Sequence, residues 1–155
     1  MVPEKSNIVP SEFIIVGGTG NLSKSKILPA LFWRFLDNQI DAQSNIILCD
    51  KYIKSKKDFF LELQSNCNEA IKSEDNNLEN WNNFIKIIKL VELDVVSGNG
   101  HLDLVEIIKE KFDENRPIIF YLAIASSLFG NSCKFIRDSG SVSYTHLRAH
   151  ETSVN

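Results

Sequence analysis

The most constraining feature of the sequence is an apolar run that leads into a glycine-rich turn and then an amphipathic segment, FIIVGGTGNLSKSKILPALFWRF at residues 13–35. The run Phe13–Val16 is apolar throughout, which is typical of a strand buried on both faces of a parallel sheet. From Leu22 to about Leu36 the apolar residues recur three and four positions apart, which predicts a helix with one buried face. Pro29 lies inside this helix and is expected to bend it or to remove one hydrogen bond.

Strands and helices alternate along the rest of the chain. The pattern predicts strands at 45–49, 87–93 and 117–124, helices at 54–73, 101–112 and from 127 onward, and an Asn-rich loop leading into a short helix at 74–84. This alternation predicts an α/β fold, a partial Rossmann-type doubly wound parallel sheet of about four strands in the order 3-2-1-4 with flanking helices. The predicted domain covers residues 13–140 and follows an N-terminal extension at residues 1–12.

Length and composition indicate one globular domain that binds neither nucleic acid nor a membrane. A chain of 155 residues corresponds to one domain, and a formal net charge of −3 gives no general affinity for nucleic acid. No apolar run is long enough for a transmembrane helix, and the polar N-terminus is unlike a secretory signal peptide. Cys49, Cys67 and Cys133 are widely spaced and match no metal-binding pattern. We therefore expect reduced thiols, no metal site and a cytoplasmic location.

The glycine-rich turn predicts a site for a dinucleotide. Gly17, Gly20 and Ser23 lie three positions apart, directly after the first strand and at the start of the first helix. Gly17 permits the tight turn, Gly20 lets a pyrophosphate approach the backbone, and the small Ser23 lets the helix pack closely on the strand. A phosphate at the positive end of the helix would also favour the cations Lys24 and Lys26. The alternative is a strand-to-helix turn that holds no ligand.

Two segments resemble the glucose-6-phosphate dehydrogenase family. GGTGNLSKSKILPALF (17–32) resembles the coenzyme site of that family, G-A-S-G-D-L-A followed by a lysine-rich turn and L-L-P-A-L. RPIIFYLAIASSLFG (116–130) resembles its N-R-L-F-Y-L-A-x-P-P segment, at a similar spacing. The resemblance covers most of residues 13–138. It implies the NADP-binding N-terminal fragment of an enzyme that oxidises glucose 6-phosphate to the 6-phosphogluconolactone, the first step of the pentose phosphate pathway.

The resemblance also implies which residues bind the cofactor. The pyrophosphate turn would consist of Gly17, Gly18, Thr19, Gly20, Asn21, Leu22, Ser23 and Lys24. Lys51 stands where the family has an arginine for the 2′-phosphate, and Phe129 matches an aromatic residue near the nicotinamide end. Asp50 precedes Lys51 where a small residue is usual. Because neighbouring residues at a strand end point to opposite sides, we expect only one of the two to face the ribose. The resemblance implies that this is Lys51, with Asp50 turned toward solvent or the lysine, which gives a modest preference for NADP.

Several departures from the family pattern limit what the chain is expected to do. Asn21 replaces an aspartate, Ser25 replaces an arginine, and Ala125 with Ser126 replaces a pair of prolines. The family's E-K-P-F-G and R-I-D-H-Y-L-G-K substrate motifs and its catalytic histidine are absent from the sequence. We therefore predict no catalytic residue here and an inactive fragment. The sugar phosphate would bind only to a longer parent protein, which is expected to be a homo-oligomer.

Two other function classes stay open at this point. One is a stand-alone nucleotide-binding module that performs no hydride chemistry. The other is a short-chain-type NAD(P) reductase, since that family also permits the GGTG start. Its Tyr-x-x-x-Lys pair is matched here by Tyr52 and Lys56, which lie too early in the chain for that role.

The C-terminal residues differ in character from the domain before them. SVSYTHLRAHETSVN (141–155) shows neither a helical nor a strand period. Residues 142–152 resemble the translation of a widely used transposon-derived sequencing adapter. We therefore expect residues 141–155 to be a non-native, disordered tail, and the natural protein to continue beyond Gly140. Without further sequence the fourth strand would form an exposed apolar edge.

Overall fold

The computed structural model describes residues 8–73, 77–110, 115–138 and 145–149. Five parallel strands form one sheet in the order β3-β2-β1-β4-β5. The strands are β1 (Glu12–Val16), β2 (Asn45–Asp50), β3 (Ile88–Glu92), β4 (Ile118–Leu122) and β5 (Thr145–Ala149). The predicted order 3-2-1-4 is confirmed for the first four strands, and the fold is the predicted doubly wound α/β arrangement.

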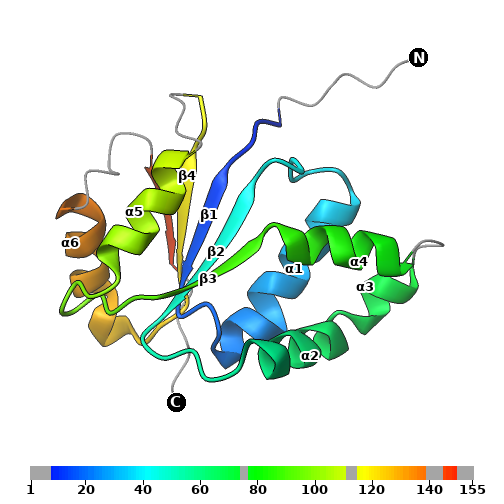
Figure 1. Ribbon diagram of the computed structural model, residues 1–155, viewed down its shortest axis with the longest axis horizontal. Coiled ribbons are helices and arrows are strands. Elements are labelled where there is room, and N and C mark those ends of the chain that lie inside the picture. The colour runs from blue at the N-terminus through cyan, green and yellow to red at the C-terminus, as the bar shows by residue number, and fades with distance from the viewer. Residues whose placement is uncertain (1–7, 74–76, 111–114, 139–144, 150–155) are drawn as a thin grey trace.

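Helices cover both faces of the sheet, as Figure 1 shows. On one face lie η1 (Ser23–Ile27, a π-helix), α1 (Leu28–Leu36), α2 (Lys56–Asn66), α3 (Asn68–Lys72) and α4 (Asn77–Lys86). On the other lie α5 (His101–Glu110) and α6 (Phe129–Asp138), which follows the short 3-10 helix η2 (Ser126–Leu128). No helix in the described ranges is long and apolar enough to cross a membrane.

Strand β1 lies in the middle of the sheet and contributes to two cores. Phe13 and Ile15 pack with α1–α4, whereas Ile14 and Val16 pack with α5 and α6. Because both faces of the strand are buried, every position is apolar after Glu12, as the sequence pattern predicted. On the larger face an aromatic cluster joins α1 to α4, with the Phe32 ring edge-on to Trp81 at a centroid distance of 5.3 Å.

The predicted helix at residues 54–73 is two helices. The chain bends at Cys67, which has φ −102° and ψ 10° and donates its amide to Leu63 O and Gln64 O. The bend keeps Ala70 and Ile71 in the core, although the sequence period by itself continues through this point. Ser55 caps the start of α2 by accepting a hydrogen bond from Asp58 N at 3.2 Å.

The C-terminal segment differs from the sequence-based expectation. Residues 141–155 were expected to be unpacked, yet Thr145–Ala149 pairs in parallel with β4 from Ile118 to Leu122. The uncovered edge of β4 offers backbone donors and acceptors that an extended segment can pair with whatever its side-chain pattern. The edge is therefore covered, contrary to the expectation. Residues 139–144 and 150–155 lie outside the described residues.

Candidate dinucleotide site

The glycine turn leaves the sheet at the carboxyl end of β1, between β2 and β4. Gly17 N and Gly18 N both donate to Cys49 O on β2, at 2.8 and 3.1 Å. Gly17 has φ +81°, and a Cβ there would lie 2.3 Å from Ala123 O after β4. A Cβ at Gly18 would lie 2.7 Å from the Cα of Leu48. These two glycines are therefore required by close packing of the turn between its neighbouring strands.

Gly20 has a different environment. It is exposed, and the nearest atom to an added Cβ is Gly17 O, at 3.3 Å. The first helical bond runs from Lys24 N to Gly20 O at 3.0 Å, so the amides of Asn21, Leu22 and Ser23 lie at a helix N-terminus, which supplies no acceptors of its own. Among the described residues no acceptor outside the helix bonds these three amides, and the exposed Gly20 beside them leaves room for an anion to approach the backbone.

The helix after the turn begins in a wide π register. Leu28 N donates to Ser23 O, five residues back, and Pro29 follows at the start of α1. In this register the next hydrogen bond would run from residue 29 to Lys24 O, but proline has no amide proton to donate. That oxygen instead accepts from Asn66 Nδ2 on α2, at 3.0 Å. The structure thus confirms that Pro29 removes a hydrogen bond, and α2 replaces it.

Ser23 and Leu22 have packing roles in the structure. Ser23 is fully buried, and within the described residues its hydroxyl has no hydrogen-bond partner. Leu22 packs against the core on the α1–α4 face. The small serine lets the helix approach the sheet closely, as predicted.

The two lysines of the first helical turns differ in their surroundings. Lys24 Nζ forms an ion pair with Glu62 Oε2 of α2, and its side chain is 17% exposed. Glu62 therefore supplies a counter-charge that was expected from a bound phosphate. Lys26 is exposed and lines a small apolar hollow with Ile27 and Tyr121.

The carboxylate of Asp50, the last residue of β2, lies against the turn. Asp50 Oδ2 accepts from Thr19 N at 3.0 Å and from Thr19 Oγ1 at 2.6 Å. From the sequence Asp50 is expected to turn toward solvent or Lys51, but in the structure its carboxylate binds Thr19. The backbone amide and the hydroxyl of Thr19 both lie within hydrogen-bond distance of the end of β2. Charge-assisted hydrogen bonds from these two donors stabilise the Asp50 carboxylate in this orientation.

Lys51 reaches Asp94 in the loop after β3. Its Nζ lies 3.8 Å from Asp94 Oδ2 and 5.6 Å from the centroid of the Tyr52 ring. The pKa of Asp94 is lowered, chiefly by the hydrogen bond from Val96 N, with further contributions from Ser97 and Lys51. Asp94 is therefore a carboxylate at neutral pH, and it holds Lys51 by charge.

A hollow of about 330 Å³ opens at the carboxyl end of β2, beside the turn. Thr19 and Lys24 line it together with Tyr52, Ile53, Lys54, Ser55, Asp58, Phe59 and Glu62. Lys54 and Ser55 are not among the site residues predicted from the sequence. Their place directly after the second strand could have indicated them, because ligands of this fold bind outside the carboxyl ends of the strands.

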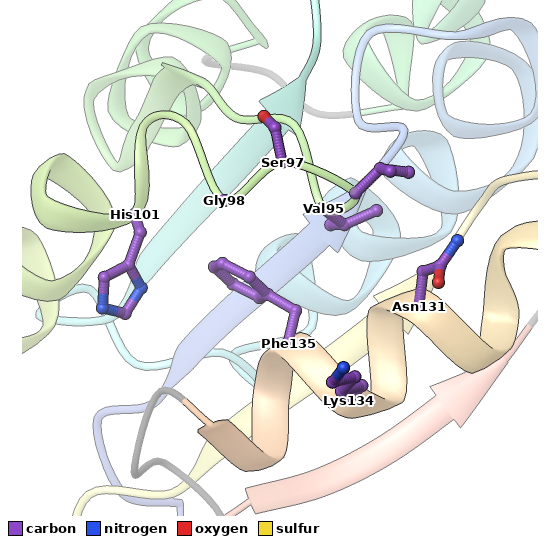
Figure 2. A pocket seen from close by; sticks show the side chains of 8 residues that line it. Val95, Ser97, Gly98, His101, Asn131, Lys134 and Phe135 are labelled. Carbon is purple, nitrogen blue, oxygen red and sulfur yellow. The ribbon is translucent and has the colours of Figure 1, made fainter.

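A second hollow, of about 360 Å³, lies on the other face of the sheet between the β3–α5 loop and α6 (Figure 2). Val95, Ser97 and Gly98 line one side, and Asn131, Lys134 and Phe135 line the other. His101, at the start of α5, is edge-on to the Phe135 ring with centroids 5.4 Å apart. Phe129, predicted near the nicotinamide end, is half-buried at the start of α6 and packs against the core of this face.

The residues of the glycine turn and of the hollow beside it fit a dinucleotide. The turn lies where β1 has β2 on one side and β4 on the other, which is the point where the strand order reverses. Gly20 is exposed, the amides of Asn21–Ser23 can donate hydrogen bonds to a ligand, and a hollow lined largely by polar residues adjoins the turn at the end of β2.

The family model described as "Glucose-6-phosphate dehydrogenase, NAD binding domain" matches residues 14–150. The chain belongs to this glucose-6-phosphate dehydrogenase domain family. The resemblance inferred from residues 17–32 and 116–130 is thereby confirmed. The family is one of oxidoreductases of glucose metabolism, and its domain takes a nicotinamide dinucleotide.

Individual glucose-6-phosphate 1-dehydrogenases match over most of the chain. That of Rhizobium meliloti is 29% identical over 131 residues, which are 84% of this chain and 26% of the relative. That of Caenorhabditis elegans is 29% identical over 124 residues, covering 77% of this chain and 23% of the relative. The chain thus spans about a quarter of the length of these relatives.

Solved structures show the same fold. A glucose-6-phosphate dehydrogenase in complex with its substrate glucose 6-phosphate superposes with a TM-score of 0.79 at 23% identity, covering 92% of this chain and 30% of that one. A glucose-6-phosphate 1-dehydrogenase from Mycobacterium avium gives a TM-score of 0.74 at 14% identity, covering 91% and 29%.

Proposed function

We propose that this chain is the NADP-binding N-terminal part of a glucose-6-phosphate dehydrogenase. The observation that carries the proposal is the glycine turn at the switch point of the sheet, with an open Gly20 and unused amides, in a chain of this family. When bound, the nicotinamide ring would accept the hydride. This chain's part is to hold the pyrophosphate at the helix N-terminus and to orient the ribose at the end of β2.

The preference for NADP rests on cations near the end of β2. Lys51 is well exposed, and an ion pair of 3.8 Å with Asp94 is loose enough for the lysine to exchange it for a phosphate. Lys54 lines the hollow beside the turn. Both side chains are long and flexible, so either can reach an anion bound at this edge. Lys51 remains our choice for the 2′-phosphate.

We further propose that the 155-residue chain does not turn over glucose 6-phosphate by itself. The substrate motifs of the family are missing from the sequence, and the chain covers only 26% of the Rhizobium meliloti relative. The sugar phosphate would bind to a longer protein, which we place in the cytoplasm as a homo-oligomer. Three free cysteines support a reducing compartment.

Calorimetric titration of the 155-residue chain with NADP and with NAD tests the proposal. We expect both to bind, NADP more tightly, and no NADPH to form when glucose 6-phosphate is added. Gly20→Ala should weaken both dinucleotides at least tenfold, because the methyl group stands where the pyrophosphate approaches. Gly130→Ala is the control, since Gly130 is likewise exposed but lies on α6, where its added Cβ meets open space, whereas that of Gly20 lies 3.3 Å from Gly17 O. Absence of binding, or equal binding by the Gly20 variant, would contradict the proposal.

We also propose that residues 142–152 derive from an adapter and that the natural sequence departs from this one after Gly140. The match of these residues to a translated adapter supports this, as does the fraction of each relative that the chain spans. Sequencing the genomic DNA downstream of the Gly140 codon tests it. We expect an open reading frame that encodes E-K-P-F-G within a few tens of codons. A genome that encodes the printed C-terminus would refute it.

A further inference from the structure

The contact between Asp50 and Thr19 brings a negative charge to the part of the site that an adenosine ribose would occupy. Both Thr19 donors are bound by one oxygen, Oδ2, at 3.0 and 2.6 Å. Within the described residues the other oxygen, Oδ1, has no hydrogen bond. Two fixed bonds orient the carboxylate, so Oδ1 keeps a defined place and can accept a further hydrogen bond.

In the part of the chain that the structure describes, no ion pair compensates this carboxylate. The ion pairs formed among the described residues join Lys24 to Glu62, Lys51 to Asp94 and Arg116 to Glu12, and none includes Asp50. The adjacent Lys51 is directed to the β3–α5 loop instead. An incoming phosphate at the end of β2 therefore faces the full charge of Asp50, at a half-buried position where water screens it incompletely.

We propose that Asp50, held in place by Thr19, is a specificity-determining residue that favours NAD and limits the preference for NADP. Its Oδ1 accepts a hydrogen bond from a ribose hydroxyl, and its charge repels a 2′-phosphate on the same ribose. Asp50 thus opposes Lys51, and the balance of the two sets the cofactor ratio. This inference rests on the proposed function, because it concerns the same dinucleotide site.

The role of Asp50 differs from that of a structural residue in a measurable way. A purely structural Asp50 would change the affinities for NAD and NADP by the same factor. A specificity determinant changes their ratio. Asp50→Asn isolates the charge, since the amide oxygen can still accept from Thr19 N and Oγ1. Asp50→Ala removes both the charge and the acceptor.

The experiment is titration of the 155-residue chain and its variants with NAD and NADP at fixed ionic strength. We expect Asp50→Asn to raise the NADP-to-NAD affinity ratio on the order of tenfold, the effect of removing one nearby charge at intermediate dielectric. Asp50→Ala should raise the ratio similarly but bind both dinucleotides more weakly than Asp50→Asn, because Thr19 is no longer held. Added salt should reduce the gain, as expected for screened charges.

Glu106→Gln is the matched control, because Glu106 is exposed on α5 and its loss changes net charge equally. The ratio should stay at the wild-type value in this variant. An unchanged ratio in Asp50→Asn, with wild-type binding intact, overturns the assignment of Asp50 and leaves the proposed function standing. If the wild-type chain binds neither dinucleotide, the proposed function itself fails. Circular dichroism of each variant separates loss of binding from loss of fold.

Discussion

Arg116 Nε lies 2.8 Å from Glu12 Oε1, and these two side chains are only 8% and 1% exposed. The pair joins the start of β4 to the start of β1, at the amino ends of the strands and therefore opposite the glycine turn. Asn45 Nδ2 donates to the same Glu12 oxygen at 3.1 Å, and Arg116 Nη2 donates to Gln43 O at 2.8 Å. The cluster fixes three strand starts without touching the candidate site.

Arg116→Met should lower the free energy of unfolding by about 3–5 kcal/mol, because it removes the guanidinium that pairs with the buried Glu12 carboxylate. Chemical denaturation measures the loss. The double variant Glu12→Leu/Arg116→Met should recover most of it, since no buried charge then remains. A loss below about 1 kcal/mol in the single variant would show that Glu12 gains water or another partner instead.

Three glycines separate backbone strain from steric overlap. Gly98→Ala should cost about 1–2 kcal/mol, because its φ is +82° while its Cβ would meet open space. Gly17→Ala should cost more, since it combines φ +81° with a Cβ 2.3 Å from Ala123 O. Gly18→Ala should also cost more than Gly98→Ala, through overlap with Leu48 and Ile15 O and without a positive φ. Thermal unfolding of the three variants measures the order of their stabilities. A Gly17 variant as stable as the Gly98 variant would contradict close packing of Gly17 against Ala123 O.

Lys51→Ala should weaken NADP binding by about 1–2 kcal/mol and leave NAD binding nearly unchanged, as expected for loss of a hydrogen bond to a charged group. Asp94→Asn should strengthen NADP binding, because it releases Lys51 from its ion pair. Lys109→Ala, an exposed lysine on α5, controls for net charge. Titration with both cofactors measures these effects. An equal loss of both affinities in Lys51→Ala would remove Lys51 from the 2′-phosphate site.

The three cysteines should react with iodoacetamide at very different rates. Burial raises the pKa of Cys67 to about 12, and burial together with the charge of Asp50 raises the pKa of Cys49 further, so both thiols stay protonated near neutral pH. Cys133 is exposed on α6. Mass spectrometry should find Cys133 alkylated in the native chain and the other two only in denaturant. Rapid native alkylation of Cys49 would show that β2 opens locally.

Truncation after Gly140 should expose the edge of β4 and cause concentration-dependent association. β5 pairs with β4 along its whole length, and β4 is an apolar strand. A chain that ends at Ala149 keeps β5 and is the matched control. Light scattering measures association, and calorimetry measures the melting temperature. If the chain that ends at Gly140 stays monomeric with an unchanged melting temperature, then residues 141–155 act as the unpacked tail that the sequence suggested.

The sequence determined the first four strands, their order and the place of the glycine turn. Apolar positions throughout Phe13–Val16 and residues 46–49 predict strands that are buried on both faces of a parallel sheet. Right-handed helical connections between such strands then place Gly17, at the end of β1, between β2 and β4. The role of Gly17 in the turn could be predicted from its residue type, because few residues other than glycine tolerate its φ of +81°.

The tertiary structure decided which partners the polar side chains take. Alternation along a strand predicts that Asp50 and Lys51 diverge, but it does not say which one faces the turn. That depended on Thr19, which presents two donors to β2, and on Asp94, which follows β3 far along the chain. The ion pair between Lys24 and Glu62 likewise depends on the tertiary structure, because it forms only where α2 packs beside η1. The β5 pairing likewise followed from backbone groups on the β4 edge, which carry no signature in side-chain sequence.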